Sequence, residues 1–339
     1  RPRSGTSPPP GSSRRWRRST RQWPGRGNAA GAERPLGSGR AGGATAVSFA
    51  ASLPLWFTFE VRGAEWQFTE RLDILPSIGA SYALGVDGLS ALLVLLTTLV
   101  CLIAVLAKTP RGREFYISAL LLESGLLGVY VALDLLLFWV AWIVAAASMC
   151  VLIGAAGGRT RIAAHVGVIT LVPGVVMLLG LLLIYVQGQA ITGAGTFDMR
   201  VFRQLALPPH VQRWVFVAFF IGCGGGLFGV FRWWLTVAAD ARGFAVPVLL
   251  SALFLKMGTF AFLKLTLPLL PDASRFFAPA IVGLGAIGIL LSALAAFTQT
   301  NWNRVLAYAS LGHLCLVTLG AFALTPDGLT GSAVHQINH

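Results

Sequence analysis

Ionisable side chains inside strongly apolar stretches are the residues with which this sequence could do chemistry. Glu123 lies in the middle of the apolar run 120–130, and Lys256 lies in the middle of 252–263. A charge at the centre of a bilayer costs about 2.5–3.5 kcal/mol on insertion scales unless it is paired or hydrated. Both residues are therefore candidates for proton transfer. Each also has a structural alternative, in which Glu123 anchors two helices by hydrogen bonds and Lys256 is a neutral packing residue.

Histidines form the third candidate group. His313 lies in the apolar stretch 307–320, and His335 and His339 lie at the end of the sequence. Imidazole both donates and accepts hydrogen bonds and titrates near neutral pH, so this group suits a hydrated proton path. The stretch around His313 contains three further polar side chains, Tyr308, Ser310 and Thr318. The alternative for His313 is a single ring that is satisfied by a neighbouring carbonyl.

The cysteines and glycines predict no cofactor site. The glycine-rich run 222–226 lies inside a predicted membrane span and not between a strand and a helix, so we expect a broken or closely packed helix there, not a phosphate loop. The cysteines lie singly, without the paired spacing that an iron–sulfur cluster or a zinc ion requires. They are Cys101, Cys150, Cys223 and Cys315. We expect this chain to bind no metal and no cofactor of its own.

Composition places these residues in a membrane protein. Of the 339 residues, 55% are hydrophobic and 12% are charged, and the mean hydropathy is +0.73. These values exclude a soluble globular enzyme. Most of the net charge of +13 lies in residues 1–43, which contain ten arginines and one acidic residue. The rest of the chain is nearly balanced in charge, so we expect the lipid bilayer as its surroundings and no nucleic acid as a partner.

Hydropathy predicts a series of membrane helices after a polar segment. Residues 1–45 are rich in Arg, Gly, Ser and Pro, and residues 60–85 are amphipathic and aromatic, so we expect a disordered segment and an interfacial stretch respectively. The sequence begins with Arg1, and a last apolar segment begins near Gly331 and stops at His339, so we expect a chain truncated at both ends. The predicted spans are 46–59, which is too short to cross, and 86–107, 115–133, 134–154, 162–187, 213–231, 245–264, 277–299 and 304–324.

Four sequence blocks together resemble the antiporter-like chain M family of respiratory NADH–quinone oxidoreductase, or complex I. They are GVDGLSALLVLLTT (85–98), EFYISALLLESGLLGVYVALDLLLFWVAW (114–142), FLKMGTFAFLKLTLPLLPDASRFFAP (254–279), and RVLAYASLGHL (304–314) with INH (337–339). The resemblance extends from about residue 65 to the end of the sequence. It implies roughly fourteen helices with two inverted five-helix repeats, each with a broken helix and a half-channel. By this resemblance the first repeat is complete here and the second is truncated.

Functional residues of that family match this sequence unevenly. Glu123, Lys256, His313 and His339 match family positions, and we expect them to form the proton path. The resemblance also implies a channel pair, a Glu that follows a Trp on the fifth helix and a Lys on the broken seventh helix. Opening and closing such a pair would shift the pKa of the lysine and so couple distant charge movement to proton release.

This sequence lacks the channel pair. Trp142 is followed by Ile143, and the lysine position falls at Gly225 or Gly226. Every predicted span nevertheless keeps its hydrophobic pattern. We therefore expect a fold-preserving paralogue whose input half-channel has decayed.

These observations predict an all-α polytopic membrane protein with the antiporter-like complex I subunit fold. The expected domains are the disordered segment 1–45, a partial N-terminal helix with an interfacial segment and one membrane helix at 46–114, the first five-helix repeat at 115–264, and the truncated second repeat at 277–339. We expect close helix packing through small residues. These are Gly128, Gly174, Gly180 and the run 222–226.

Three functions fit this fold. The first is a membrane-arm subunit of a proton-translocating NADH–quinone oxidoreductase, in the cell inner (plasma) membrane or an organellar inner membrane. Its partners would be the other membrane-arm subunits, and NADH and quinone would be used elsewhere in the complex. The second is a subunit of a cation/proton antiporter or a membrane-bound hydrogenase. The third is a scaffold that conducts no protons, which the missing Glu–Lys pair favours.

Overall fold

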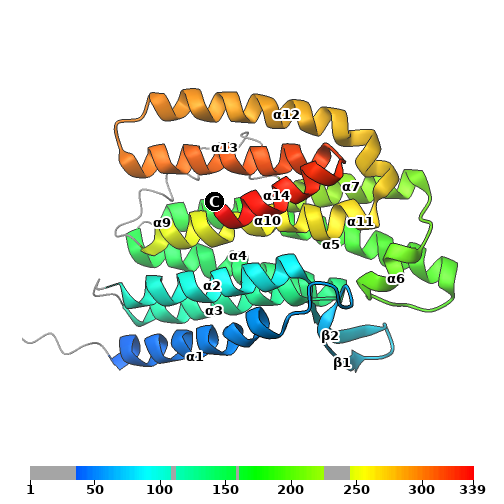
Figure 1. Ribbon diagram of the computed structural model, residues 1–339, viewed down its shortest axis with the longest axis horizontal. Helices are drawn as coiled ribbons and strands as arrows, with labels where there is room; N and C mark the ends of the chain where they lie inside the picture. The colour runs from blue at the N-terminus through cyan, green and yellow to red at the C-terminus, as the bar shows by residue number, and fades with distance from the viewer. Residues whose placement is uncertain (1–35, 108–111, 158–159, 225–244) are drawn as a thin grey trace, which may run out of the picture. The chain divides into compact units, whose positions relative to one another are not determined.

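The computed structural model describes residues 36–107, 112–157, 160–224 and 245–339. These residues belong to one compact unit that is almost entirely helical, with the long helices running alongside one another (Figure 1). This confirms the prediction of an all-α membrane protein. The inverted repeats and the domain boundaries drawn from them remain predictions.

Seven helices of the described residues are long and apolar enough to cross a membrane. They are α2 (Gly88–Leu106), α3 (Arg113–Val131), α4 (Leu135–Gly157), α5 (Thr160–Thr192), the interrupted helix Ala245–Leu269, α12 (Pro271–Phe297) and α13 (Trp302–Phe322). The expected spans 86–107, 115–133 and 304–324 lie within two residues of α2, α3 and α13 at each end. Helices form here because hydrocarbon offers no partner for an unpaired backbone group. The other helices are α1 (Leu36–Thr58), α6 (Met199–Gln204), α7 (Pro209–Gly224) and α14 (Pro326–Asn338).

The N-terminal region differs from the prediction in two ways. Residues 36–45 were expected to be disordered but form the first part of α1, which packs along α2. Residues 60–85 were expected to form an interfacial stretch, for which no secondary structure was predicted, and most of them form an antiparallel hairpin of β1 (Gln67–Leu75) and β2 (Ala80–Val86). The turn between the strands closes at Gly79, whose φ of 68° favours glycine. The sequence lacked a clean alternation over β1, because almost all of its side chains are exposed.

The hairpin lies at the end of the bundle where α2 begins (Figure 1). A single bridge joins Leu84 of β2 to Ala132, before α4, and a second bridge joins Asp134 in the same connection to Asp198, before α6. Asp87 caps α2 by accepting a hydrogen bond from the Ser90 backbone N–H at 2.8 Å. Several distant segments of the chain therefore meet at this end.

The interrupted helix is the least regular element of the bundle. It consists of α9 (Ala245–Leu249), the π-helix η1 (Leu250–Phe254), α10 (Lys256–Ala261), the π-helix η2 (Phe262–Thr266) and α11 (Leu267–Leu269). A π-helical turn is rare, carries an extra residue and is frequent at functional sites. The helix expected at 245–264 is therefore present but not uniform.

Small residues bring the helices together as predicted. A Cβ added at Gly128 would lie 2.8 Å from Ala141 of α4, and one at Gly180 would lie 2.9 Å from Ala218 of α7. At Gly222 it would lie 2.6 Å from Met177 of α5. Glycine is needed at these positions because a larger side chain would collide with the neighbouring helix. Such close packing is important in lipid, since apolar burial does not drive helix association there.

Candidate functional site

Lys256 is buried at the first position of α10. Only 1% of its surface is exposed, and its ammonium group has no ion pair among the described residues. Its backbone carbonyl accepts a hydrogen bond from Gln336 Nε2 of α14 at 2.9 Å. The interrupted helix is thus attached to α14 at the lysine itself.

Three histidines lie together beside this lysine. His313 Nδ1 of α13 is 3.0 Å from His335 Nε2 of α14, and the ring centre of His313 is 5.1 Å from those of His335 and His339. His339 caps the C-terminal end of α14 four residues after His335, and its backbone N–H donates a hydrogen bond to the His335 carbonyl at 3.0 Å. The charge of Lys256 acts on both of them. The structure therefore brings three of the four predicted proton-path residues, Lys256, His313 and His339, into one group.

The histidine group contains buried polar atoms that lack partners. His339 Nδ1 and Gln336 Oε1 have no hydrogen-bond partner among the described residues. No set of three His, Cys, Asp or Glu side chains within the described ranges has the geometry of a metal site. The arrangement can pass protons between ring nitrogens, because each ring can both donate and accept.

Glu123 is separate from this group. It is 2% exposed on α3, and neither carboxylate oxygen has a hydrogen-bond partner in the described part of the chain. Ser48 of α1 lies near enough to interact with its carboxylate, and the charge of Glu123 acts on Cys101 of α2. The predicted site residues therefore fall into two places, Glu123 between α1, α2 and α3, and the lysine–histidine group between α10, α13 and α14.

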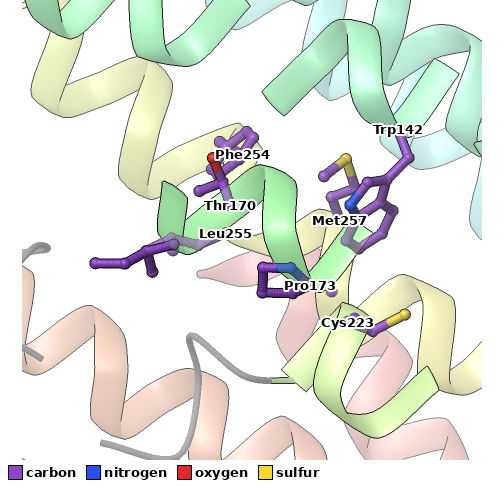
Figure 2. Close-up of a pocket in the computed structure, with 10 residues that line it drawn as sticks. Trp142, Thr170, Pro173, Cys223, Phe254, Leu255 and Met257 are labelled. Atoms are coloured by element: carbon purple, nitrogen blue, oxygen red, sulfur yellow. The ribbon is translucent and has the colours of Figure 1, made fainter. Parts of the chain in front are cut away.

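A small cavity lies next to α10. It holds about 60 Å³, room for a few water molecules. Figure 2 shows Trp142 of α4 and Met257 of α10 on one side and Cys223 of α7 close by, with Pro173 of α5 between the helices. The hydroxyl of Thr170 is one of its few polar groups. The cavity borders Met257 and Gly258, which follow Lys256 in the chain.

The structure describes one of the two positions of the missing channel pair, position 143. The side chain of Ile143 points toward α5, where an added Cβ on Gly174 would lie 2.7 Å from Ile143 Cδ1. Trp139 Nε1 donates a hydrogen bond to the Gly174 carbonyl at 2.8 Å in the same contact. Position 143 is therefore closely packed and apolar. Gly225 and Gly226, the alternatives for the lysine position, lie outside the described residues.

Lys264 is the last residue of the expected span 245–264, a position from which a lysine side chain could extend to the lipid headgroups, but it is buried. Its Nζ lies 2.7 Å from Asp87 Oδ2 and 3.1 Å from Ser90 Oγ, and 3.8 Å from the ring centre of Trp66. Only 3% of its side chain is exposed. Sequence reasoning missed this ion pair because the partner lies 177 residues away.

Two further aspartates organise the connections outside the spans. Asp134 accepts hydrogen bonds from Ser81 N and Oγ and from two amide groups at the start of α4. Asp198 accepts from Arg200 and Arg71 at 2.7 and 3.1 Å. Burial by itself would raise the pKa of Asp198, but these hydrogen bonds and charges outweigh it and hold the pKa below the ordinary value.

The architecture and the buried charges point to one class of protein. The described residues contain seven candidate spans, an interrupted helix with a buried lysine and a neighbouring histidine group, and such features are typical of membrane proteins that move ions or protons. The family described as NADH:quinone oxidoreductase/Mrp antiporter, TM matches residues 132–339. The chain therefore belongs to this family.

Individual relatives agree with this assignment. The chain is 33% identical over 304 residues to NADH-ubiquinone oxidoreductase chain 4 of Arabidopsis thaliana, with 87% of this chain and 60% of the relative covered. A chain of respiratory complex I from Thermus thermophilus with bound NADH is 28% identical, with a TM-score of 0.76 over 89% of this chain and 65% of that one. The Mrp complex from Dietzia sp. DQ12-45-1b has the same fold, with a TM-score of 0.76 at 20% identity over 90% of this chain and 33% of that one. The chain spans about 60% of the length of the Arabidopsis relative.

Proposed function

We propose that this chain is a membrane-arm subunit of a proton-translocating NADH–quinone oxidoreductase and that Lys256 is its central proton-binding group. The observation that carries the proposal is the buried lysine on an interrupted helix, beside three histidines that contact one another. An amine in that position can bind and release a proton, and the rings can pass it to α13. The relatives named as chain 4 support the assignment to such a complex.

The redox chemistry belongs to other chains in this proposal. NADH and quinone would bind partner subunits, and this chain would contribute the proton path and the contacts within the membrane arm. Its membrane would be the cell inner membrane or an organellar inner membrane.

The test is NADH-driven proton uptake in inverted membrane vesicles, measured with a pH-sensitive dye. We expect Lys256→Ala to lower proton uptake by about tenfold or more at an equal amount of assembled complex. Arg275→Ala, which removes an exposed cation from α12, is the control and should leave uptake unchanged. Normal uptake by Lys256→Ala in a normally assembled complex would contradict the proposal.

A scaffold without proton conduction is the second candidate. The close packing of Ile143 against Gly174 favours it, because that position has no space for a hydrated carboxylate. In the same vesicle assay, a scaffold predicts that neither Lys256→Ala nor Glu123→Gln alters uptake, while removal of the whole chain prevents assembly.

A further inference from the structure

Lys256 lies on a short α-helical segment between two irregular turns. The segment is α10, and the π-helical turns η1 and η2 lie on either side of it, where the regular α-helical hydrogen-bond pattern is interrupted. Contacts from other elements contribute to the position of α10. One such contact is the hydrogen bond from Gln336 to the Lys256 carbonyl.

The strongest external contact is at Lys264, inside η2. Its ammonium group has three donors, and three partners surround it. They are Asp87 Oδ2 at 2.7 Å, Ser90 Oγ at 3.1 Å and the face of Trp66 at 3.8 Å. We call Lys264, Asp87, Ser90 and Trp66 the latch.

The latch connects η2 to several other elements. Ser90 donates a hydrogen bond to the Tyr130 carbonyl near the end of α3 at 2.7 Å, and Asp87 caps α2. The ring of Tyr130 packs edge-on against Phe260 of α10, with ring centres 4.9 Å apart. The latch and Tyr130 therefore attach η2 and the C-terminal end of α10 to the start of α2 and the end of α3.

Arg203 of α6 supports the latch from outside. It donates a hydrogen bond to the Lys264 carbonyl at 3.3 Å, pairs with Glu65 and lies over the ring of Trp66 at 5.2 Å. The charged groups that act on Lys264 are therefore Asp87, Arg203 and Glu65. Burial would raise the pKa of Asp87, but the Lys264 charge and the hydrogen bonds from Lys264 and Ser90 hold it below its ordinary value.

We infer that the latch sets the position of the interrupted helix and thereby of Lys256, so that Lys264 is a positioning residue for proton transfer at Lys256. The inference rests on the proposed function for its consequence, but its structural part stands separately. Lys264 is eight residues after Lys256, and the two residues are connected by the short helix α10 and the start of η2. When the ammonium leaves the latch, η2 loses its fixed end and α10 can shift relative to the histidine group.

Hydrogen–deuterium exchange of the full chain in detergent tests the structural part. We expect Lys264→Met to speed amide exchange across residues 250–266 by about tenfold while α4 is unaffected. Lys264→Arg, which keeps the charge, should exchange more slowly than Lys264→Met. The matched control is Arg213→Met, because Arg213 is an exposed cation that lies 4.1 Å from the ring of Phe276. Wild-type exchange in Lys264→Met, or equal acceleration in Arg213→Met, overturns the inference.

Ser90→Ala gives a second measurement if Lys264→Met does not fold. It removes one acceptor of the ammonium and the bond to Tyr130 but leaves the ion pair, and it should speed exchange in the same residues by a smaller factor. Unchanged exchange there overturns the inference.

Proton uptake in vesicles tests the functional consequence. Lys264→Met should move the midpoint of the pH profile of uptake, and Lys264→Arg should keep the wild-type midpoint. An unmoved midpoint with faster exchange would overturn the positioning role. If vesicles with the wild-type chain showed no proton uptake, the proposed function would be contradicted. The exchange result would still decide whether the latch holds the interrupted helix.

Discussion

Glu123 and Lys256 are both buried charges, but their surroundings differ. Lys256 lies near the histidine group, and its chain neighbours Leu255 and Met257 line a small cavity, whereas Glu123 lies between α1, α2 and α3 with Ser48 as its nearby polar side chain. An isolated carboxylate in an apolar environment is expensive unless it is protonated or hydrated. Glu123 therefore needs either a proton or water at rest, which is what a relay group requires.

Replacement of Glu123 by Gln distinguishes a relay from an anchor. Gln keeps the shape and hydrogen-bonding capacity but cannot titrate, so Glu123→Gln should lower proton uptake by roughly tenfold or more without lowering the amount of assembled complex. The neighbouring Ser124→Ala removes an exposed hydroxyl that bonds to the Leu120 carbonyl of the same helix, should have no effect and serves as the control. Unchanged uptake in Glu123→Gln would make Glu123 an anchor.

Short connections at the hairpin end determine how the helices begin. Asp134 caps α4 and at the same time holds Ser81 of β2, so one carboxylate fixes the register between the hairpin and a membrane helix. Asp198 caps α6 and gathers Arg71 of β1 and Arg200. These residues lie where the chain leaves the apolar helices and backbone groups need new partners.

Loss of the Asp134 cap should destabilise the protein. Asp134→Ala removes four hydrogen bonds to a carboxylate that is 1% exposed, and we expect it to cost about 2–3 kcal/mol in the free energy of unfolding. Thermal unfolding in detergent measures the change. Asp327→Ala, at an exposed position in the first turn of α14, is the control and should cost less than about 1 kcal/mol. Equal effects of the two would contradict the capping role.

Acid should remove the contribution of Asp198. Its folded-state pKa is lowered, so its stabilisation is present above the unfolded value of about 3.9 and is lost as the pH falls through the folded-state pKa. Both arginine partners are partly exposed, so we expect about 1 kcal/mol. Asp198→Asn should unfold at a lower temperature than wild type at neutral pH, and the difference should shrink at acid pH. A difference that is independent of pH would show that charge is not the cause.

At the scale of the molecule, close approach between helices holds the bundle together. Gly125 of α3 faces the α4 backbone, where an added Cβ would lie 2.6 Å from the Ala145 nitrogen. Neither backbone can yield without moving a whole helix. Gly331 of α14, in contrast, faces open space.

The same substitution should therefore have opposite effects at these two glycines. Gly125→Ala should lower the free energy of unfolding by about 1–3 kcal/mol, because it separates α3 from α4. Gly331→Ala should raise it by about 0.5–1 kcal/mol, because alanine favours the helix and meets no neighbour. Thermal unfolding of both variants in one detergent makes the comparison. If Gly125→Ala and Gly331→Ala both lowered the free energy of unfolding, steric contact would not be the cause of the difference between the two positions.

The candidate site was partly predictable. Residue type and an apolar environment were enough to select Glu123, Lys256 and His313, because an ionisable side chain inside a membrane span is costly unless it is paired or hydrated. Their grouping was not predictable. Glu123 lies apart from the other two, and Lys264 is paired although its position near a helix end indicated a free lysine.

The amino-acid sequence is enough to predict the membrane class and most of the spans, with the ends of α2, α3 and α13 within two residues, because a bilayer forces each span to satisfy its backbone locally. It also marked the small residues through which helices approach. Only the tertiary structure decided the start of α1, the hairpin, the π-helical turns around Lys256 and the pairing of Lys264 with Asp87. Each of these depends on contacts between segments far apart in the chain, and no periodicity within a single segment records such a contact.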